Sequence, residues 1–149
     1  MKDKLKELYK TVILKYNKAP YNYEKREGAT HHLEAYNPIC GDHFHLYFEM
    51  KDGLIEQIHF HGYGCAISKA STSVLAKHLE GKSIEEALVL CEEFEQVVVP
   101  TSESQPIKKE EFEAFEAARD FPGRLQCATL SWETMQTFLN QNKSAINDD

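Results

Sequence analysis

A cysteine preceded by two closely spaced glycines constrains this chain more than any other feature of its sequence. The run Gly62-Tyr63-Gly64-Cys65 follows a segment with the alternating pattern of a strand and precedes one with the spacing of a helix. Glycine suits a tight turn that brings the backbone close to whatever the sulfur holds. A thiol at a helix N-terminus is favoured as the thiolate, because unpaired N–H groups and the positive end of the helix dipole lie there. The sequence therefore predicts a functional cysteine at the start of a helix.

Two other segments carry candidate metal ligands for the same site. Cys40-Gly41-Asp42 lies in a predicted loop, and Cys127 lies off the main apolar stripe of the last predicted helix. Three cysteines and one carboxylate are enough for one tetrahedral zinc site. The ligands are too far apart in the sequence to form a local zinc motif, so spacing alone leaves a shared site open. The alternatives are a small core residue for each cysteine and an ordinary turn residue for Asp42.

Cys91 and Arg124 receive different interpretations. Cys91 falls on the apolar stripe of a predicted helix, so we expect a structural core residue. Arg124 precedes Cys127 by three residues and therefore shares its side of the helix. Three thiolates and one carboxylate around Zn²⁺ leave a net charge of about −2, which a neighbouring guanidinium would offset. The alternative for Arg124 is a solvated side chain at a helix end.

Length, composition and charge narrow the class of protein. The 149 residues and their ordinary composition predict a single soluble domain over residues 1–149. Apolar runs are too short for a membrane span, and the charged N-terminus leads into an amphipathic pattern, which favours the cytoplasm. A net charge of −7 argues against a nucleic acid partner. The reducing cytoplasm favours metal binding or thiol chemistry over disulfides for the four cysteines.

The first half of the chain reads as a helix followed by three strands. We expect the helix over residues 3–16, a loop over 17–30, and strands over 31–36, 43–51 and 55–61.

The last two strands form a predicted hairpin around Asp52 and Gly53. A three-residue loop from Asp52 to Leu54 would pair Leu46 with Phe60 and keep the apolar side chains on one face. We therefore predict a bulged hairpin rather than a tight two-residue turn.

The second half of the chain reads as helices. They are expected over residues 66–80, from 84 to 98, over 107–118 and from 125 to about 139. Gly81 would stop the first, Ser83-Ile84-Glu85-Glu86 is a capping box for the second, and the tail from Asn140 is expected to fray. Strands followed by helices predict an α+β fold, with a three-stranded antiparallel sheet covered by helices on one face.

Histidines gather on the other face of the predicted sheet. In the expected register His45 opposes His61, while His43 and His59 lie on the same side. Paired histidines across strands can bind metal. We interpret them instead as a solvated polar face, because the rest of that face has no further feature of a site.

Three stretches carry a resemblance to a known family. They are Asn37-Pro38-Ile39-Cys40-Gly41-Asp42, Gly62-Tyr63-Gly64-Cys65-Ala66-Ile67-Ser68-Lys69-Ala70-Ser71 and Cys127. Together they resemble the U-type iron–sulfur assembly proteins IscU, NifU and SufU, and the similarity covers nearly the whole chain.

Within that family the chain looks most like SufU. Gln126 stands where the scaffold proteins have a histidine before the last cysteine, and Phe121-Pro122-Gly123-Arg124 replaces their proline-proline-lysine chaperone motif. The segment over about 91–120 matches a helical insertion that marks SufU, as does Arg124 in the run that leads to Cys127.

The resemblance implies a zinc-dependent sulfur acceptor acting with a pyridoxal-phosphate cysteine desulfurase of the SufS type. Zinc would be held by Cys40, Asp42, Cys65 and Cys127, and Cys40 would take the persulfide sulfur when a desulfurase histidine replaces it on zinc. Such a carrier acts with its partner rather than as a stand-alone enzyme, and it passes sulfur to downstream iron–sulfur assembly proteins.

Three rival functions remain at this point. The first is a scaffold that assembles a [2Fe–2S] cluster on the same ligands, and the second is a structural zinc-binding interaction domain. A zinc hydrolase is disfavoured, because four protein ligands leave no open coordination position.

Overall fold

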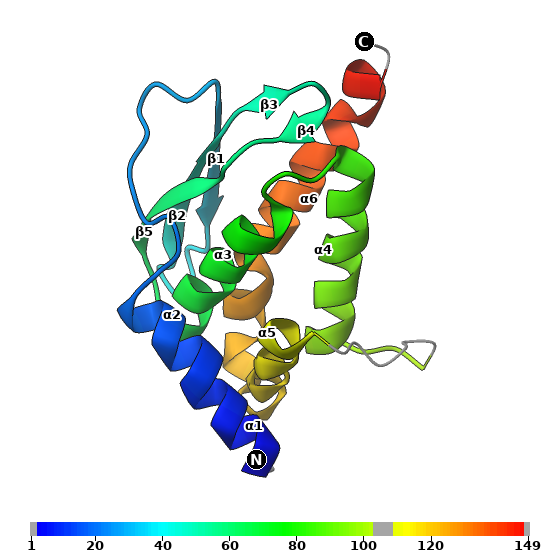
Figure 1. The fold of residues 1–149 in the computed structure, drawn as a ribbon. Coiled ribbons are helices and arrows are strands. Elements are labelled where there is room, and N and C mark those ends of the chain that lie inside the picture. Colours follow the sequence, from blue (N-terminus) through cyan, green and yellow to red (C-terminus); the bar gives the residue numbers. More distant parts are fainter. Residues whose placement is uncertain (1–2, 103–108, 148–149) are drawn as a thin grey trace.

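The N-terminal helix packs one apolar stripe against the rest of the protein. The structure is a computed structural model and describes residues 3–102 and 109–147. Helix α1 (Asp3–Leu8), a π-helical segment (Tyr9–Leu14) and α2 (Lys15–Lys18) follow one another in the chain. Leu8, Ile13 and Tyr16 are buried, as the sequence pattern predicts. The helix therefore lies against the helical layer (Figure 1), and most of its polar residues are exposed.

Three antiparallel strands form the sheet that carries the site. They are β1 (His31–Tyr36), β2 (His43–Phe48) and β5 (His59–Tyr63), in the spatial order β1-β2-β5. Leu46 pairs with Phe60, and His45 pairs with His61. The predicted register is confirmed, and it puts Phe44, Leu46 and Phe60 on the buried face.

The hairpin between these strands differs from the sequence prediction at its tip. Strands β3 (Met50–Lys51) and β4 (Leu54–Ile55) pair, and only Asp52 and Gly53 connect them. Both turn residues have positive φ, 53° and 76°, the backbone conformation of a tight two-residue turn. The predicted three-residue loop is wrong, because Leu54 pairs with Lys51.

A bulge farther down the hairpin reconciles the tight turn with the confirmed register. The Glu56 N–H donates to the Glu49 carbonyl at 2.9 Å, while the next recorded pair is Tyr47 with His59. Two residues on the returning side, Gln57 and Ile58, therefore oppose Phe48 alone. The extra residue moves the apolar side chains back to the core face, which the turn by itself would not do.

Helices α3 (Ala66–Leu79) and α4 (Ile84–Val98) begin and end where the sequence predicts. Gly81 follows α3 with φ +77°. The Ser83 hydroxyl accepts from the Glu86 N–H at 3.2 Å, and the Glu86 carboxylate accepts from the Ser83 N–H at 3.0 Å. This reciprocal capping box confirms the predicted start of α4.

The C-terminal third departs from the prediction in two places. The predicted helix over 107–118 is divided into α5 (Glu110–Glu113) and a 3₁₀ segment (Ala114–Asp120), and residues 103–108 lie outside the described part. A further 3₁₀ turn (Pro122–Arg124) leads into α6 (Leu125–Asn147). The expected fraying from Asn140 is wrong, because α6 continues to Asn147.

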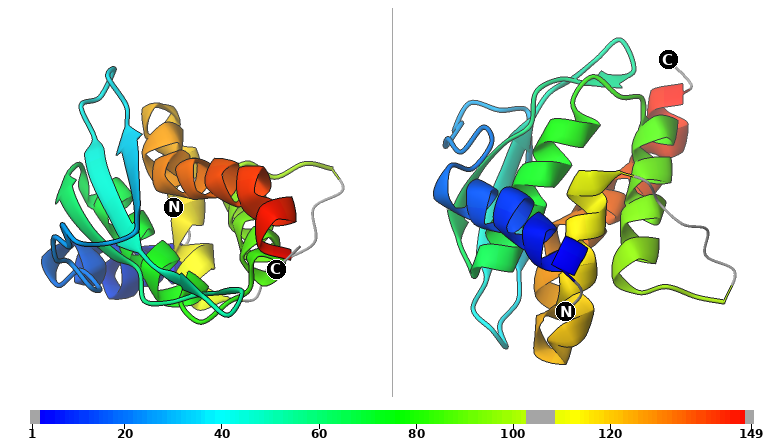
Figure 2. Two further views of the ribbon diagram at one scale, coloured as in Figure 1. Left: turned by 90° about the horizontal axis from the view of Figure 1, so that it is seen from above. Right: turned by 60° about the horizontal axis from the view of Figure 1, so that its bottom comes forward.

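Helices cover one face of the sheet, which confirms the predicted α+β fold. Figure 2 shows the helical layer on one side of the strands, with α3 and α6 next to them. The centre of this layer is aromatic: Trp132 stacks on Phe94 with ring centroids 4.3 Å apart, and Phe112 meets the edge of both. None of the helices in the described part of the chain has the length and apolar character of a membrane span.

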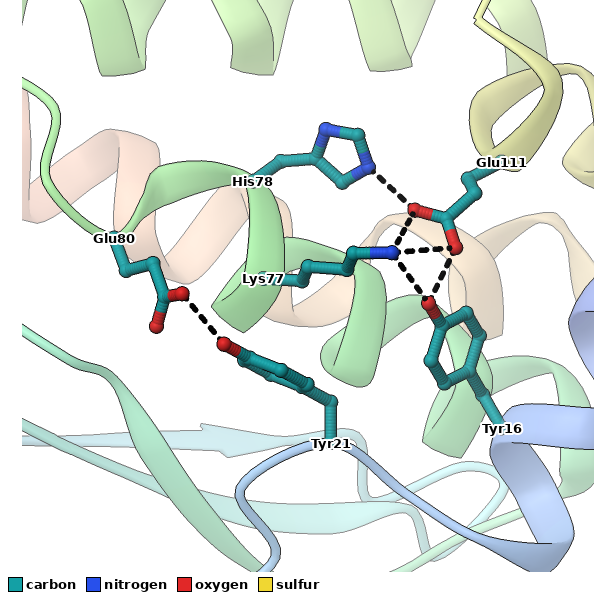
Figure 3. A network of polar contacts seen from close by, with 6 residues as sticks. All are labelled: Tyr16, Tyr21, Lys77, His78, Glu80 and Glu111. Carbon is teal, nitrogen blue, oxygen red and sulfur yellow. Dashed lines mark hydrogen bonds and ion pairs between the residues drawn. The ribbon is translucent and has the colours of Figure 1, made fainter.

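A polar network ties the N-terminal helix to α3 and α5 (Figure 3). The Glu111 carboxylate accepts from the Tyr16 hydroxyl, from Lys77 at 3.3 Å and from His78 at 2.8 Å. Burial alone would raise the pKa of Glu111, but hydrogen bonds from His78, Tyr16 and Lys77 outweigh it and lower the pKa to about 2. Three elements that are distant in sequence therefore meet on one ionised carboxylate.

Candidate metal centre

A loop closed by its own hydrogen bonds presents Cys40. The Asn37 side chain accepts from the Ile39 N–H at 3.0 Å, and the Asn37 N–H donates to the Asp42 carbonyl at 2.9 Å. Gly41 reverses the chain with φ +80°. As a result the Cys40 side chain is exposed, while Asp42 is only 3% exposed.

The glycines before Cys65 leave room for close packing around Asp42. At Gly62, φ is +145°, and a Cβ would lie 2.1 Å from the His43 carbonyl oxygen of the paired strand. At Gly64, a Cβ would lie 2.9 Å from Asp42 Oδ1 and 2.4 Å from Ser68 Oγ. Any larger residue would therefore push the carboxylate or the strand out of position.

Cys65 is the N-cap of α3, as its place in the sequence predicts. Its sulfur accepts from the Ser68 N–H at 3.4 Å, and its own N–H donates to Asp42 Oδ1 at 3.1 Å. The carboxylate of Asp42 therefore lies close to the backbone at the start of a helix, where negative charge is stabilised.

Three of the four predicted ligands form a compact group. Cys40 Sγ lies 3.3 Å from Asp42 Oδ2 and 3.9 Å from Cys127 Sγ, and the three donor groups all lie within 4.8 Å of one another. Tetrahedral zinc with Zn–S bonds of about 2.3 Å separates two sulfur ligands by about 3.8 Å. The two sulfurs and the carboxylate therefore fit a zinc-sized cation.

Cys65 lies beside this group rather than inside it. Its thiol contacts Ser68 Oγ at 3.7 Å and also interacts with the Cys127 thiol. Cys65 is thus adjacent to Cys127 without belonging to the group of donors that lie within 4.8 Å of one another.

The electrostatics of the centre call for a cation. Burial raises the pKa of the Cys127 thiol, and the neighbouring Asp42 and Cys65 raise it further. The pKa of Arg124 is raised by a hydrogen bond with Cys127 and by the charge of Cys65. A bound divalent ion would lower the pKa values of these thiols and so favour the thiolates. Arg124 lies where its positive charge offsets the net negative charge that the ligands leave on the site.

Cys91 does not belong to this group of converging donors. It is 2% exposed within α4, and burial raises the pKa of its thiol to about 12. The sequence-based interpretation of a core residue is consistent with this burial.

Two polar residues of the site have roles that sequence reasoning missed. The Asn37 amide donates to the Gln126 side chain at 3.3 Å, so the loop of Cys40 is tied to the residue before Cys127. Ser68 supports Cys65 through both its N–H and its hydroxyl. Their only signal in the sequence is their proximity to the cysteines.

Comparison with known proteins gives a consistent family. The model of the NifU-like N-terminal domain matches residues 8–128. A protein named iron–sulfur cluster assembly scaffold protein IscU, from Streptococcus pyogenes serotype M1, is 34% identical over 95% of this chain and 89% of its own. A protein named zinc-dependent sulfurtransferase SufU, from Bacillus subtilis, is 33% identical over 87% of both chains.

A solved structure shares the fold. The crystal structure described as an iron–sulfur cluster assembly scaffold protein for the SUF system, from Fervidobacterium islandicum, has a TM-score of 0.77 and 30% sequence identity. The match covers 88% of this chain and 96% of that one.

Proposed function

This chain belongs to the family of NifU-like N-terminal domains, and on that premise we propose that it is a zinc-dependent sulfur acceptor of iron–sulfur cluster assembly. Family membership supports the general role in assembly. The relatives named SufU and IscU are about equally similar to this chain, so the acceptor role depends on the chemistry of its own residues.

In the proposed site Cys40, Asp42, Cys65 and Cys127 hold the metal, and Arg124 offsets the excess negative charge. Zinc, when bound, keeps the thiols deprotonated at neutral pH while reducing their nucleophilicity. Asp42 suits a site that must release one ligand. A carboxylate and three thiolates together carry a large negative charge, and release of one thiolate from the metal lowers the charge of the remaining ligand set.

The exposure of Cys40 is the observation that carries the proposal. Of the four cysteines, Cys40 alone is exposed, Cys65 is half-buried, and the other two are buried. A thiol that receives sulfur from another protein must be reachable, whereas thiols that only hold metal need not be. Its position on a loop, rather than in a helix, also lets Cys40 move while Cys127 stays in place.

The proposed transfer balances without an added oxidant or reductant. The Cys40 thiolate attacks the outer sulfur of a cysteine persulfide on the desulfurase. A new S–S bond forms on Cys40, the old S–S bond breaks, and the desulfurase cysteine leaves as a thiolate.

A cysteine desulfurase of the SufS type, with pyridoxal phosphate, is the proposed partner, and downstream iron–sulfur assembly proteins in the cytoplasm are the proposed recipients. Ile39, Tyr36 and Tyr63 are 88%, 53% and 65% exposed around the Cys40 loop. Large exposed apolar side chains near a reactive group suit a protein partner.

The decisive experiment maps the transferred sulfur. The protein is incubated with its cognate desulfurase and cysteine under single-turnover conditions and analysed by mass spectrometry. We expect one extra sulfur atom on Cys40, strong stimulation of desulfurase turnover, and loss of both in Cys40→Ala. Cys91→Ala is the matched control and should behave as the wild type. Normal stimulation by Cys40→Ala would contradict the proposal, as would sulfur mapped to Cys65 or Cys127.

A scaffold for a [2Fe–2S] cluster is the second candidate, favoured by the name of the Streptococcus pyogenes relative. Gln126 counts against it, because a neutral amide cannot act as the basic ligand or proton acceptor that an imidazole supplies. Anaerobic reconstitution with iron and sulfide separates the two functions. A stable cluster absorbance would favour the scaffold, and rapid loss of iron would favour the acceptor.

A further inference from the structure

The outer face of the sheet is lined almost entirely by histidine and tyrosine. Five of the seven histidines lie on it. Across the three strands its side chains are His32, Glu34 and Tyr36 on β1; His43, His45 and Tyr47 on β2; and His59, His61 and Tyr63 on β5. An ordinary solvated sheet face mixes Lys, Glu and Thr. This face instead concentrates imidazole, the commonest protein ligand of transition metals.

Three of these side chains converge between β1 and the first half of β2. Glu34 is the direct cross-strand partner of His45, and Glu34 Oε1 lies 2.5 Å from His43 Nε2. One donor atom from each of Glu34, His43 and His45 lies within 4.8 Å of the other two. Two imidazoles and one carboxylate in this arrangement are a common protein ligand set for divalent transition metals.

His32 orients one of the ligands. Its Nε2 lies 2.7 Å from His45 Nδ1, and its ring stacks on Tyr47 with centroids 4.9 Å apart. The contact occupies Nδ1 of His45 and leaves Nε2 for a metal. Metal-binding histidines usually have their second ring nitrogen held in this way.

We propose that Glu34, His43 and His45 form a second metal site, for a zinc-class divalent cation, with His32 as its positioning residue. The site is open to solvent, since Glu34 is exposed and His43 only half-buried. Three protein ligands leave at least one coordination position for water.

The site is distinct from the cysteine centre in both place and ligand type. Asp42 directly precedes His43, but its side chain is buried on the inner side with Cys65, whereas His43 faces outward among the rings of Tyr36 and His45. The inference therefore does not rest on the proposed sulfur-acceptor function.

Cobalt(II) tests the site because its spectrum reports the ligand type. The full chain is first given one equivalent of Zn²⁺ and is then titrated with Co²⁺. Cobalt on thiolates has a strong sulfur-to-metal charge-transfer band, whereas cobalt on imidazole and carboxylate shows only weak visible bands. We expect one equivalent of cobalt with the visible bands alone.

Variants identify the ligands. His43→Gln and His45→Gln should each weaken cobalt binding by more than ~10-fold, and His32→Ala by about 10-fold as an orienting residue. His61→Gln is the matched control: it lies opposite His45 but outside the converging group, and it should bind as the wild type does.

Three results would overturn the second site. They are no cobalt uptake by the zinc-loaded wild type at millimolar cobalt, uptake with the sulfur band only, and equal affinity in His43→Gln and His61→Gln. Melting temperatures of the variants show whether any loss of binding reflects unfolding. Absence of the sulfur-to-cobalt band shows that zinc stays on the cysteine centre, so the result is independent of the proposed sulfur-acceptor function.

Discussion

Gly64 shows, at the scale of single residues, how a missing side chain shapes the metal centre. The space that its Cβ would occupy is bounded by Ser68 Oγ, Phe44 Cε2 and Asp42 Oδ1, all within 2.9 Å. The glycine is needed here for close approach, not for an unusual backbone angle. The glycine-flanked cysteine in the sequence is thus explained by what packs against it.

Gly64→Ala should damage the site through these contacts. We expect a loss of about 1–3 kcal/mol in the free energy of unfolding, together with weaker zinc binding, because overpacking displaces the Asp42 carboxylate. Urea denaturation and metal analysis measure the two effects. Gly28→Ala is the control, since a Cβ there meets nothing within 4 Å. Equal stability of the two variants would show that the crowding at Gly64 relaxes at no cost.

Glu111 connects three elements of the fold, so we expect its protonation at low pH to destabilise their packing. The pKa of its carboxyl is lowered to about 2 in the folded protein, and an unfolded chain has its ordinary value near 4.5. A lowered pKa stabilises the fold above the unfolded value, and the contribution is lost as the pH falls from about 4.5 towards 2. A pKa shift of this size corresponds to a contribution of roughly 3 kcal/mol to the free energy of unfolding, and solvent screening of a partly exposed group reduces the contribution to about 1 kcal/mol.

Glu111→Gln should therefore flatten the acid limb of the stability curve. We expect the variant to be less stable than the wild type by about 1 kcal/mol near neutral pH and nearly equal to it near pH 2. Denaturation at several pH values gives the comparison. Glu110→Gln changes an exposed neighbour and should leave the acid limb as it is. A parallel loss at every pH in Glu111→Gln would mean that packing, not ionisation, is responsible.

At the scale of the whole molecule, the candidate centre joins segments that are far apart in the sequence. Its ligands come from the loop before β2, from the start of α3 and from the first turn of α6. Because such a site does not exist in the unfolded chain, the free energy of metal binding adds to the stability of the fold.

Loss of the metal should accordingly lower the melting temperature of the entire protein. We expect Cys127→Ser and Cys65→Ser to reduce zinc content and melting temperature together, and treatment of the wild type with a chelator to do the same. The fluorescence of Trp132, the single tryptophan, reports the unfolding of the helical layer. Full zinc occupancy in both variants would contradict the four-ligand assignment.

Local pattern was sufficient for most of the fold. Alternation placed the hairpin strands β2 and β5 and their register, and the capping box of Ser83 and Glu86 placed α4, because these features depend on residues close together in the chain. The same holds for Cys65 as the N-cap of α3. The sequence also predicted the burial of Cys91, which lies on an apolar stripe, but not that of Cys127, which is 1% exposed.

The tertiary structure decided what depends on contacts between distant segments. The hairpin has a tight two-residue turn and a separate bulge, and helix α5 ends at Glu113. Packing also brings the Cys127 sulfur within 3.9 Å of the Cys40 sulfur, while the Cys65 thiol contacts Ser68. The pairing of Asn37 with Gln126 and of His32 with His45 also appears only there. The periodic patterns of the sequence do not predict such contacts, because they form only when strands and helices pack on one another.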